Sequence, residues 1–279
     1  MSTRRNKNFA KSGDSKKHPK HTTKHTTKPK KRPTLGLSGD EIVLYGSHAV
    51  SAAIANPNRQ IKRFLATEQA ADKHFDEAKA RGLTIAVVDN DEINAITGAG
   101  AVHQGLALIT RPLEGGDIHD ADTMSLVVVL DQITDPHNVG AIIRSAVAMG
   151  AEAVISTHKN APRENGLMAK IASGGLDHIE MIQVSNLAQT LDKLQTFDFL
   201  TVGLDSEGPK DMTESLHGNK IALVLGAESQ GLRRLTRERC DILARLDMPG
   251  AIKSLNVSNA AALSLYLARQ HLGKRSKDA

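Results

Sequence analysis

The fold of this chain is decided by residues 126–150, which read LVVVLDQITDPHNVGAIIRSAVAMG. The Val and Leu run at 126–130 has no polar interruption, as expected of a parallel strand that is covered on both faces. Loop-type residues follow it. An apolar stripe then recurs at helical spacing, through Val139, Ile142, Ile143, Ala146 and Val147. The stretch therefore predicts a strand, a loop and an amphipathic helix, which we expect to be capped near Asn138 and to end at Gly150.

The same alternation continues along the chain. Strands are also predicted at 153–155, 179–184, 200–204, 221–225 and 242–246, with helical patterns between several of them. This alternation predicts the α/β class, with a mostly parallel sheet that carries helices on both sides. Ligands in such sheets bind at the carboxyl ends of the strands, so the residues that follow each strand are candidates for a functional site.

A smaller α/β unit is predicted upstream of this sheet. Helices are expected at 47–55, 69–81 and 91–97, and strands at 61–66, 84–88 and 106–109. Arg111, Pro112 and the Gly115-Gly116 pair are typical of a linker. The predicted organisation is a tail at 1–38, a small domain at 39–110, a linker at 111–123, a larger domain at 124–273 and a C-terminal tail at 274–279.

The positive charge of the chain is concentrated at its N-terminus. Of the 36 Lys and Arg residues, 12 lie within residues 1–33, which hold one acid, Asp14, so this segment carries +11 and the remainder about −6. A segment with so few large apolar residues cannot bury enough surface to fold, and we expect it to be disordered. Two roles stay open for it: an arm that binds RNA phosphates without sequence preference, and a solubilising leader.

The composition is that of a soluble protein rather than a membrane protein. Hydrophobic residues make up 40% of the chain. No apolar run approaches the roughly 18 residues of a membrane span, and no apolar segment typical of a secretory signal lies near the N-terminus. Cys240 is the only cysteine, which fits a reducing compartment and a structural thiol. We therefore expect a cytoplasmic protein.

The first candidate segment for chemistry is the loop and helix start at 131–146. Arg144 lies well off the apolar stripe of the predicted helix. It shares a face with His137, Gly140 and Ala141, where small side chains would leave room for a ligand or a phosphate. An Arg on the polar side of a helix is usually a solvated surface residue, so this segment alone is weak evidence.

Two further segments place small and polar residues after predicted strands. LGAESQGL at 225–232 contains Gly226 and Gly231, which would let the backbone approach a cofactor closely. MPGAIKSLNVSNAAA at 248–262 contains Ser254 and Asn256, either of which could cap the helix that follows. Steric need in a turn and helix capping are the ordinary explanations for these residues.

The order and spacing of the three segments resemble the three motifs of the SpoU (TrmH) family of RNA ribose 2′-O-methyltransferases. The motifs are Asn138-Val139-Gly140 with Arg144, Gly226-Ala227-Glu228 with Gly231, and Ser254-Leu255-Asn256-Val257-Ser258. The resemblance spans about residues 126–272. None of the motif positions departs from the family pattern.

The upstream unit resembles the small ribosomal-protein-like RNA-binding domain of many members of this family. The resembling residues are Leu44-Tyr45-Gly46 with His48-Ala49-Val50, and His103-Gln104-Gly105. With both domains present, the chain is most similar to the branch that methylates a guanosine ribose in 23S rRNA. A tRNA ribose stays open as an alternative substrate.

The resemblance also implies a fold detail, a cofactor and an assembly. The C-terminal domain should contain a deep trefoil knot of the SPOUT type, bind S-adenosylmethionine and form a homodimer with shared active sites. The implied catalytic residues are Arg144, Asn138, Glu228, Ser254 and Asn256. The implied cofactor-binding residues are Gly226, Leu246, Leu255, Leu225 and Met248. No metal is expected, because methyl transfer needs none.

The reaction of this family requires a group that can act on the ribose hydroxyl, and Arg144 is the residue that the resemblance implies for this role. A ribose 2′-OH must be held in line with the methyl group and must lose its proton. Arg144 is a poor base, because the pKa of arginine is normally above about 12. We expect its guanidinium to bind the adjacent phosphate and to stabilise the developing alkoxide. A deprotonated Arg144 and a proton relay through His137 stay open.

Other classes of protein fit the sequence less well. A dinucleotide-dependent oxidoreductase or an ordinary Rossmann methyltransferase would need a Gly-rich turn after the first strand, where residues 131–137 stand instead. A catalytically silent RNA-binding or ribosome-assembly protein of the same fold is the remaining alternative. Aromatic residues make up only 3% of the chain, so RNA should be held by backbone and shape contacts rather than on a stacking platform.

Overall fold

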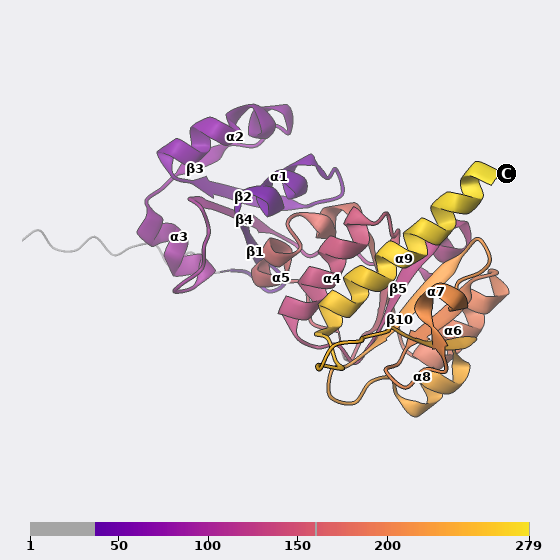
Figure 1. Cartoon of the computed structure of the whole chain (residues 1–279). Helices are drawn as coiled ribbons and strands as arrows, with labels where there is room; N and C mark the ends of the chain where they lie inside the picture. The colour runs from indigo at the N-terminus through magenta and orange to yellow at the C-terminus, as the bar shows by residue number, and fades with distance from the viewer. Residues whose placement is uncertain (1–36, 160, 279) are drawn as a thin grey trace, which may run out of the picture. The chain divides into compact units, whose positions relative to one another are not determined.

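The computed structural model describes residues 37–159 and 161–278, which form two β-sheets with their helices (Figure 1). Apart from residues 37 and 38, the predicted basic tail lies outside this range. Within it, no helix combines the length and the apolar character that crossing a membrane requires. The backbone of the last helix, α9 (Val257–Asp278), continues into the predicted C-terminal tail.

The first sheet has four strands in the order β1-β4-β2-β3. Strand β4 (Leu106–Thr110) pairs antiparallel with β1 (Ile42–Tyr45) and β2 (Ile61–Ala66), and β2 pairs parallel with β3 (Ile85–Val87). The helices of this unit are α1 (Ser47–Ala55), α2 (Glu68–Ala80) and α3 (Asn90–Thr97). The sequence predicted all of these elements except β1, whose four residues are too few to show an alternation.

The second sheet has seven strands in the order β7-β6-β5-β10-β8-β11-β9, and each neighbouring pair is parallel. The strands are β5 (Leu126–Asp131), β6 (Ala153–Thr157), β7 (Glu180–Val184), β8 (Leu200–Leu204), β9 (Lys210–Asp211), β10 (Ile221–Gly226) and β11 (Ile242–Arg245). The predicted α/β class with a mostly parallel sheet is thereby confirmed.

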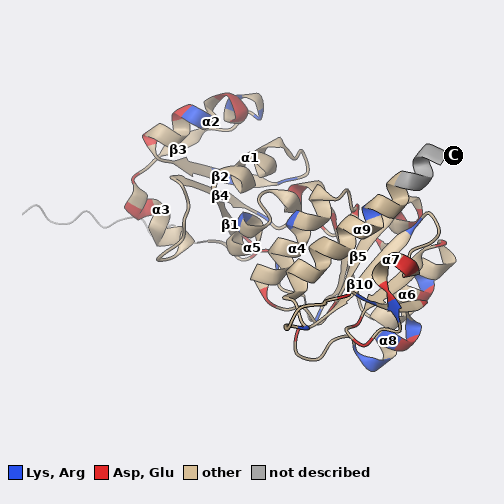
Figure 2. Cartoon of the chain, viewed as in Figure 1, with Lys and Arg blue, Asp and Glu red and all other residues tan. Residues whose placement is uncertain are grey.

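Helices cover both faces of the large sheet. Helices α4 (Pro136–Ala148) and α9 pack together on one face, as Figure 1 shows, and α6 (Leu187–Thr196) and α8 (Arg234–Arg239) pack together on the other. In Figure 2 charged residues gather on α6 and α8, whereas the central strands are mostly tan. Shorter helical segments connect the layers: α5 (Gly166–Ile171), α7 (Met212–Ser215), η1 (Ile118–Thr123) and η2 (Gly175–His178).

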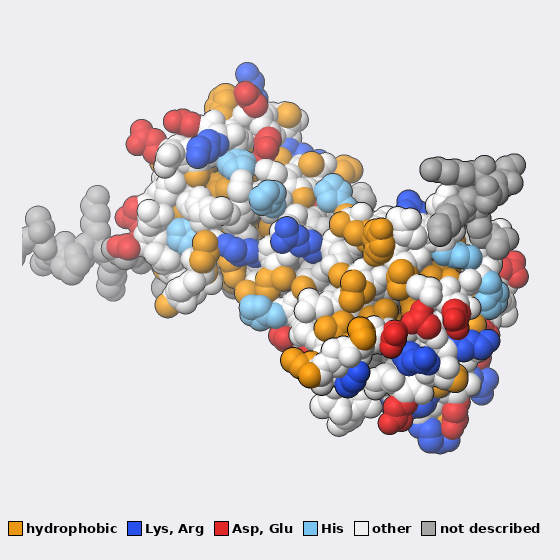
Figure 3. Space-filling view, viewed as in Figure 1, with side chains coloured by type: hydrophobic (Ala, Val, Ile, Leu, Met, Phe, Trp, Pro, Cys, Tyr) orange, Lys and Arg blue, Asp and Glu red, His pale blue; other side chains and the backbone are white. Residues whose placement is uncertain are grey.

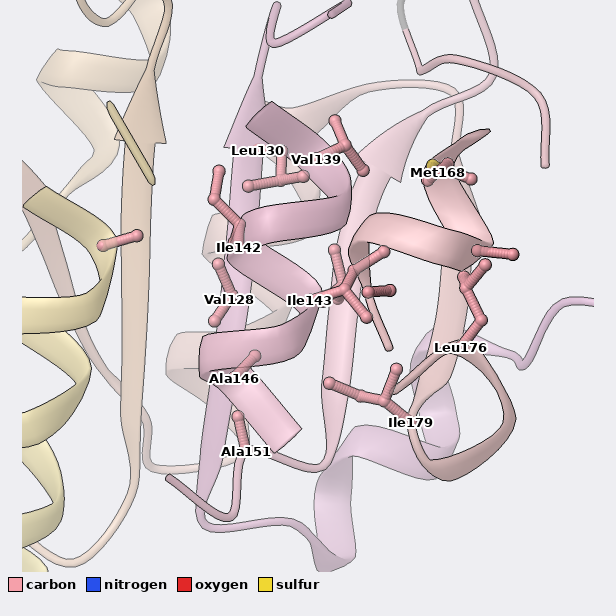
Figure 4. Packing of buried hydrophobic residues seen from close by; sticks show 14 of the residues in the cluster. Val128, Leu130, Val139, Ile142, Ile143, Ala146, Ala151, Met168, Leu176 and Ile179 are labelled. Atoms are coloured by element: carbon pink, nitrogen blue, oxygen red, sulfur yellow. The ribbon is translucent and has the colours of Figure 1, made fainter. Parts of the chain in front are cut away.

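The core beneath α4 follows from the apolar stripe of the sequence. Val139, Ile142, Ile143 and Ala146 are buried and contribute to the cluster that also contains Val128 and Leu130 of β5 (Figure 4). Burying an aliphatic side chain of this size stabilises the fold by about 1.5–3 kcal/mol. This packing fixes the rotation of α4 about its axis, and hence the side on which its polar residues lie.

The start of α4 differs from the prediction. The helix begins at Pro136, and the side chain of Asp135 caps it by accepting a hydrogen bond from the backbone N–H of His137 at 3.0 Å. Asn138 is therefore inside the first turn and is not the cap. Proline at the first helical position and an Asp before it are both favoured at a helix start. The side chain of Asn138 is left free for other contacts.

A buried ion cluster joins the first sheet to the second. The guanidinium of Arg59, whose side chain is fully buried, lies 2.6 Å from Glu164 Oε1 and 2.9 Å from Asp177 Oδ1. Glu164 also accepts a hydrogen bond from the backbone N–H of Leu113 at 2.9 Å. The cluster therefore also holds part of the predicted linker, whose second half forms η1.

Candidate active site

Three loops meet at the carboxyl edge of the large sheet. They follow β5, β10 and β11, and β10 lies directly beside β5, with Gly226 opposite Asp131. Strand β8 separates β10 from β11. The three motif segments lie far apart in the sequence, but the strand order brings their loops to one edge, where ligands bind in parallel sheets.

Side chains of the three motifs are hydrogen-bonded to one another. Glu228 Oε1 accepts hydrogen bonds from Asn138 Nδ2 at 3.3 Å and from Asn256 Nδ2. Asn256 Nδ2 also donates to Asn138 Oδ1 at 2.9 Å. The same Glu228 oxygen accepts the backbone N–H of Val257 at 3.2 Å. One carboxylate thus connects the start of α4, the loop after β10 and the start of α9.

Asn256 has a second role as a helix cap. Its Oδ1 accepts the backbone N–H of Ser258 at 2.8 Å, at the start of α9. Capping of this helix was one of the roles that the sequence suggested for Ser254 or Asn256, and the structure assigns it to Asn256. An amide can do both, because its oxygen caps the helix while its NH₂ group donates to Glu228 and Asn138.

A cavity of about 180 Å³ lies beside this network. All five residues that the sequence suggested for cofactor binding line it: Leu225, Gly226, Leu246, Met248 and Leu255. Glu228 and Ser254 line it as well, whereas Asn138, Asn256 and Arg144 do not. The structure therefore brings nine of the ten suggested residues to this cavity or to the adjoining network, and leaves Arg144 apart.

The cavity also has walls that the sequence analysis missed. Asp205 and Ser206 follow β8, and Ala227 and Lys253 lie beside motif residues. The carboxyl-end rule could have identified Asp205 and Ser206, since β8 was predicted. The Asp205 carboxylate is held by Arg237, whose Nη1 lies 2.7 Å from Asp205 Oδ2. Lys253 Nζ donates to the carbonyl of Met248 at 2.6 Å, which ties the third loop together.

The chemistry of the lining suits a partly apolar cation. Leucine and methionine side chains form much of the wall, and Asp205 and Glu228 supply carboxylates. The apolar wall can cover a flat ring or an aliphatic chain, and the carboxylates favour positive charge. The lining thus combines apolar surface with the carboxylates of Asp205 and Glu228 and the ammonium of Lys253.

The glycines of the second loop line the cavity and also meet the steric need that the sequence analysis gave as their ordinary explanation. A Cβ on Gly226 would lie 2.2 Å from the backbone carbon of Gly231. Gly231 itself has a φ of +64°, which only glycine adopts readily, and a Cβ there would meet open space. The close approach is thus made by the chain to itself, because the loop folds back across its own start.

Arg144 lies on the exposed side of α4, away from the cavity. Among the described residues it has no hydrogen-bond or ion-pair partner, and its guanidinium is available for a ligand. The expectation that Gly140 leaves room for a ligand beside it is wrong. Gly140 is buried against α5, where a Cβ would lie 2.8 Å from the Met168 carbonyl oxygen.

Two family models match the chain. The model described as the SpoU rRNA Methylase family matches residues 125–266. The model described as RNA 2′-O ribose methyltransferase substrate binding matches residues 43–115. The first covers the large sheet and its loops, and the second covers the small sheet.

Curated proteins and solved structures are similar over most of the chain. The 23S rRNA (guanosine-2′-O-)-methyltransferase RlmB of Yersinia pestis is 36% identical over 80% of this chain and 95% of its own length. A putative TrmH family tRNA/rRNA methyltransferase of Staphylococcus haemolyticus is 31% identical over 81% and 94%. The fold is similar to the SpoU methyltransferase AviRb of Streptomyces viridochromogenes in complex with AdoMet, with a TM-score of 0.71, 22% identity and coverage of 83% and 90%.

Proposed function

We propose that this chain, which belongs to the SpoU rRNA methylase family, transfers the methyl group of S-adenosylmethionine to a ribose 2′-OH of ribosomal RNA. The main structural support for this proposal is that Asn138, Glu228 and Asn256 meet beside a cavity with apolar walls and carboxylates. Relatives at about 36% identity are named as 23S rRNA guanosine methyltransferases, so a guanosine of 23S rRNA is the proposed target. The proposed location is the cytoplasm.

The residues of the cavity fit the cofactor. S-adenosylmethionine supplies a methyl group on a positively charged sulfur, which makes that methyl electrophilic. Leu225, Leu246 and Leu255 provide apolar surface for the uncharged parts of the molecule, and Asp205 and Glu228 favour its positive charge. One oxygen of Glu228 also accepts hydrogen bonds from the two asparagines. Glu228 therefore fixes the positions of these side chains in addition to contributing negative charge.

The protein's part in the reaction is positioning and charge stabilisation. The attacking hydroxyl must lie in line with the methyl group and must give up a proton as the new C–O bond forms. In this proposal, the Arg144 guanidinium binds the neighbouring phosphate and stabilises the negative charge that develops on the ribose oxygen. Asn138 and Asn256 hold together the loops that are proposed to face the ribose, and Ser254 lines the cavity beside them.

The isolation of Arg144 supports a homodimer with shared active sites. Arg144 lies on α4 and does not line the cavity of its own chain, while α9, which packs against α4, and the loop before α9 expose apolar side chains: Ile252, Leu255, Leu263 and Tyr266. Figure 3 shows apolar side chains gathered on the surface where α4 and α9 lie. Such a patch is typical of a subunit interface. A second copy on this face would bring its Arg144 toward the cavity of the first.

Mixed dimers test this arrangement. Neither Arg144→Ala nor Asn256→Ala alone should be active, but dimers formed from one copy of each should retain one site with both residues intact. Recovery of methyl transfer on mixing the two variants supports shared sites. A wild-type protein that sediments as a monomer at the concentration of the assay, with full activity, would contradict them.

The reaction itself is tested with labelled S-adenosylmethionine on protein-free 23S rRNA and on bulk tRNA. Arg144→Ala should lower kcat/KM by at least about 100-fold, as expected for loss of a group that stabilises developing charge. Arg234→Ala is the matched control, because Arg234 is exposed and, among the residues that the structure describes, pairs only with Glu238 on its own helix. Label in tRNA alone would keep the reaction and replace the substrate. RNA binding without transfer would favour the silent binding protein.

A further inference from the structure

Two motifs of the small sheet have no part in the proposed methyl transfer, and the structure brings them together. Gln104 Oε1 accepts a hydrogen bond from the backbone N–H of Ser47 at 3.0 Å, at the start of α1. Gln104 itself has a φ of +57°, an uncommon value for a residue other than glycine. The residues around Gly46 and the His103-Gln104-Gly105 segment therefore form one wall, and the strained backbone of Gln104 suggests a functional reason for it.

A cavity of about 440 Å³ lies against this wall. It is bordered by residues that follow β1, β2 and β3, and by the turn before β4. Its polar side chains come from Ser47, Thr67, Gln69, Lys73, His74, Asn90 and Gln104. Ala70 and Leu106 supply a small apolar surface. None of the described residues that line it is Asp or Glu, in contrast to the acidic balance of the chain after residue 33.

Several of these polar groups have unused hydrogen-bonding capacity. Within the described part of the chain, the side chains of Gln69, Lys73 and Asn90 have no hydrogen-bond or ion-pair partner. The wall behind them is held in place by His74, which is buried and lies 3.2 Å from Ser47 Oγ and 2.9 Å from Glu77 Oε2. The cavity thus combines a fixed wall with free amides and one free ammonium.

We propose that this cavity binds one unpaired nucleotide of the RNA substrate. Amide side chains offer a donor and an acceptor together, which is the chemistry that reads the edge of a base. An exposed Lys binds phosphate as a point charge, and the absence of carboxylates from the lining favours an anionic ligand. The volume lies within the range of roughly 300–1,000 Å³ typical of small-molecule sites. Sequence-specific RNA recognition mostly uses such unpaired bases.

This inference rests on the proposed function, since it concerns how the same RNA is selected. The proposed nucleotide site lies in a different part of the molecule from the proposed active site and is formed by different residues. The cavity lies on the small sheet, within the 43–115 segment that matches the substrate-binding family model. The proposed role is therefore recognition of the substrate, with the transfer chemistry left to the large sheet.

The test uses the full-length protein with a Gln69→Ala/Asn90→Ala double variant and a Lys73→Ala variant. Lys79→Ala is the matched control, because Lys79 is exposed on the same helix α2 and does not line the cavity. We expect the double variant to raise KM for protein-free 23S rRNA by about tenfold with kcat nearly unchanged. Lys73→Ala should weaken RNA binding and reduce its salt dependence, whereas Lys79→Ala should do neither.

Two further measurements separate the possible failures. Binding of S-adenosylmethionine without RNA, followed by calorimetry, and the far-UV circular dichroism spectrum should both be unchanged in all variants, which shows that the large and the small sheet are folded. If the wild type methylates RNA and the double variant keeps its KM, the cavity proposal is overturned and the proposed function stands. If the wild type methylates no RNA, direct RNA binding decides: weaker binding by the double variant supports the cavity, and equal binding overturns it. An effect of Lys73→Ala alone would overturn base recognition.

Discussion

At the scale of single residues, the site shows which roles a sequence can reveal. Asn256 and Gly226 stand out in the sequence because few residue types can cap a helix or permit a backbone crossing, and the structure gives each of them such a role. The position of Asp205 after a predicted strand was a signal in the sequence, but its partner Arg237 was not, because Arg237 lies 32 positions away in the chain and becomes a partner only through folding. Residues with intrinsic conformational roles can thus be predicted more readily than residues selected by distant partners.

Cys240 allows a prediction at this scale. Burial, with smaller effects from Asp241 and Asp131, raises the pKa of its thiol to about 12. Because only the thiolate reacts, labelling of the native protein by iodoacetamide at pH 8 should be at least about 100-fold slower than labelling of the unfolded protein. The native rate should also keep rising up to pH 10, since the folded pKa is higher still. Mass spectrometry would measure both, and a plateau near pH 9 would refute the raised pKa.

At the scale of elements, the strand and helix at 126–150 were predictable because their apolar pattern matches their burial. The start of α4 was placed too late, since Asp135-Pro136 can begin a helix as well as form a loop. The reason for Gly140 could not be found from α4 alone, because the residue that crowds it belongs to α5. What the sequence does not show is which element packs against which.

The contact between α4 and α5 predicts the effect of adding one methyl group. Gly140→Ala would place a Cβ 2.8 Å from the Met168 carbonyl oxygen and 3.0 Å from Ile171 Cβ. Such overpacking should lower the free energy of unfolding by about 1–3 kcal/mol. Gly250→Ala is the control, because a Cβ there meets nothing within 4 Å. Urea unfolding of both variants measures the difference. Equal unfolding midpoints for Gly140→Ala and Gly250→Ala would show that α4 and α5 can move apart to accommodate the added methyl group without a loss of stability.

The anchor of the second loop gives another prediction. Asp131 is fully buried at the end of β5 and accepts hydrogen bonds from Arg233 Nε at 2.6 Å and from the Arg233 backbone N–H at 2.9 Å. Since the loop from Gly226 to Arg233 begins opposite the same carboxylate, removing the side chain of Arg233 should loosen the cavity wall. Arg233→Ala should raise KM for S-adenosylmethionine by about tenfold, with partial recovery in Arg233→Lys. Unchanged KM in both variants would exclude a positioning role.

At the scale of the whole molecule, the Arg59 cluster connects the small sheet, the linker and the large sheet. No sequence pattern indicated it, because Glu164 and Asp177 lie 105 and 118 residues away from Arg59. From the sequence alone, Arg59 would be interpreted as an ordinary surface residue, and only the structure shows that its side chain is buried. The small sheet carries the proposed nucleotide cavity and the large sheet the proposed active site, so this cluster is a structural connection between the two sheets that carry them.

Removing Arg59 should therefore destabilise the protein in a pH-dependent way. Arg59→Ala leaves two buried carboxylates unpaired, which should lower the free energy of unfolding by about 3–5 kcal/mol near pH 8. Arg234→Ala, which breaks an exposed pair, is the control and should change it by less than about 1 kcal/mol.

The sign of the pH dependence follows from Glu164. Burial already raises the pKa of Glu164 in the wild type, although Arg59 opposes this, so without Arg59 the pKa should rise further. A carboxyl whose pKa is higher in the folded than in the unfolded state contributes stability at low pH, and this contribution is lost as pH rises through the folded pKa. The loss caused by Arg59→Ala should therefore be smaller at pH 5 than at pH 8. Urea unfolding at the two pH values measures it, and an equal or larger loss at pH 5 would mean that the carboxylates reach water once Arg59 is gone, so that the cluster is not a sealed connection between the two sheets.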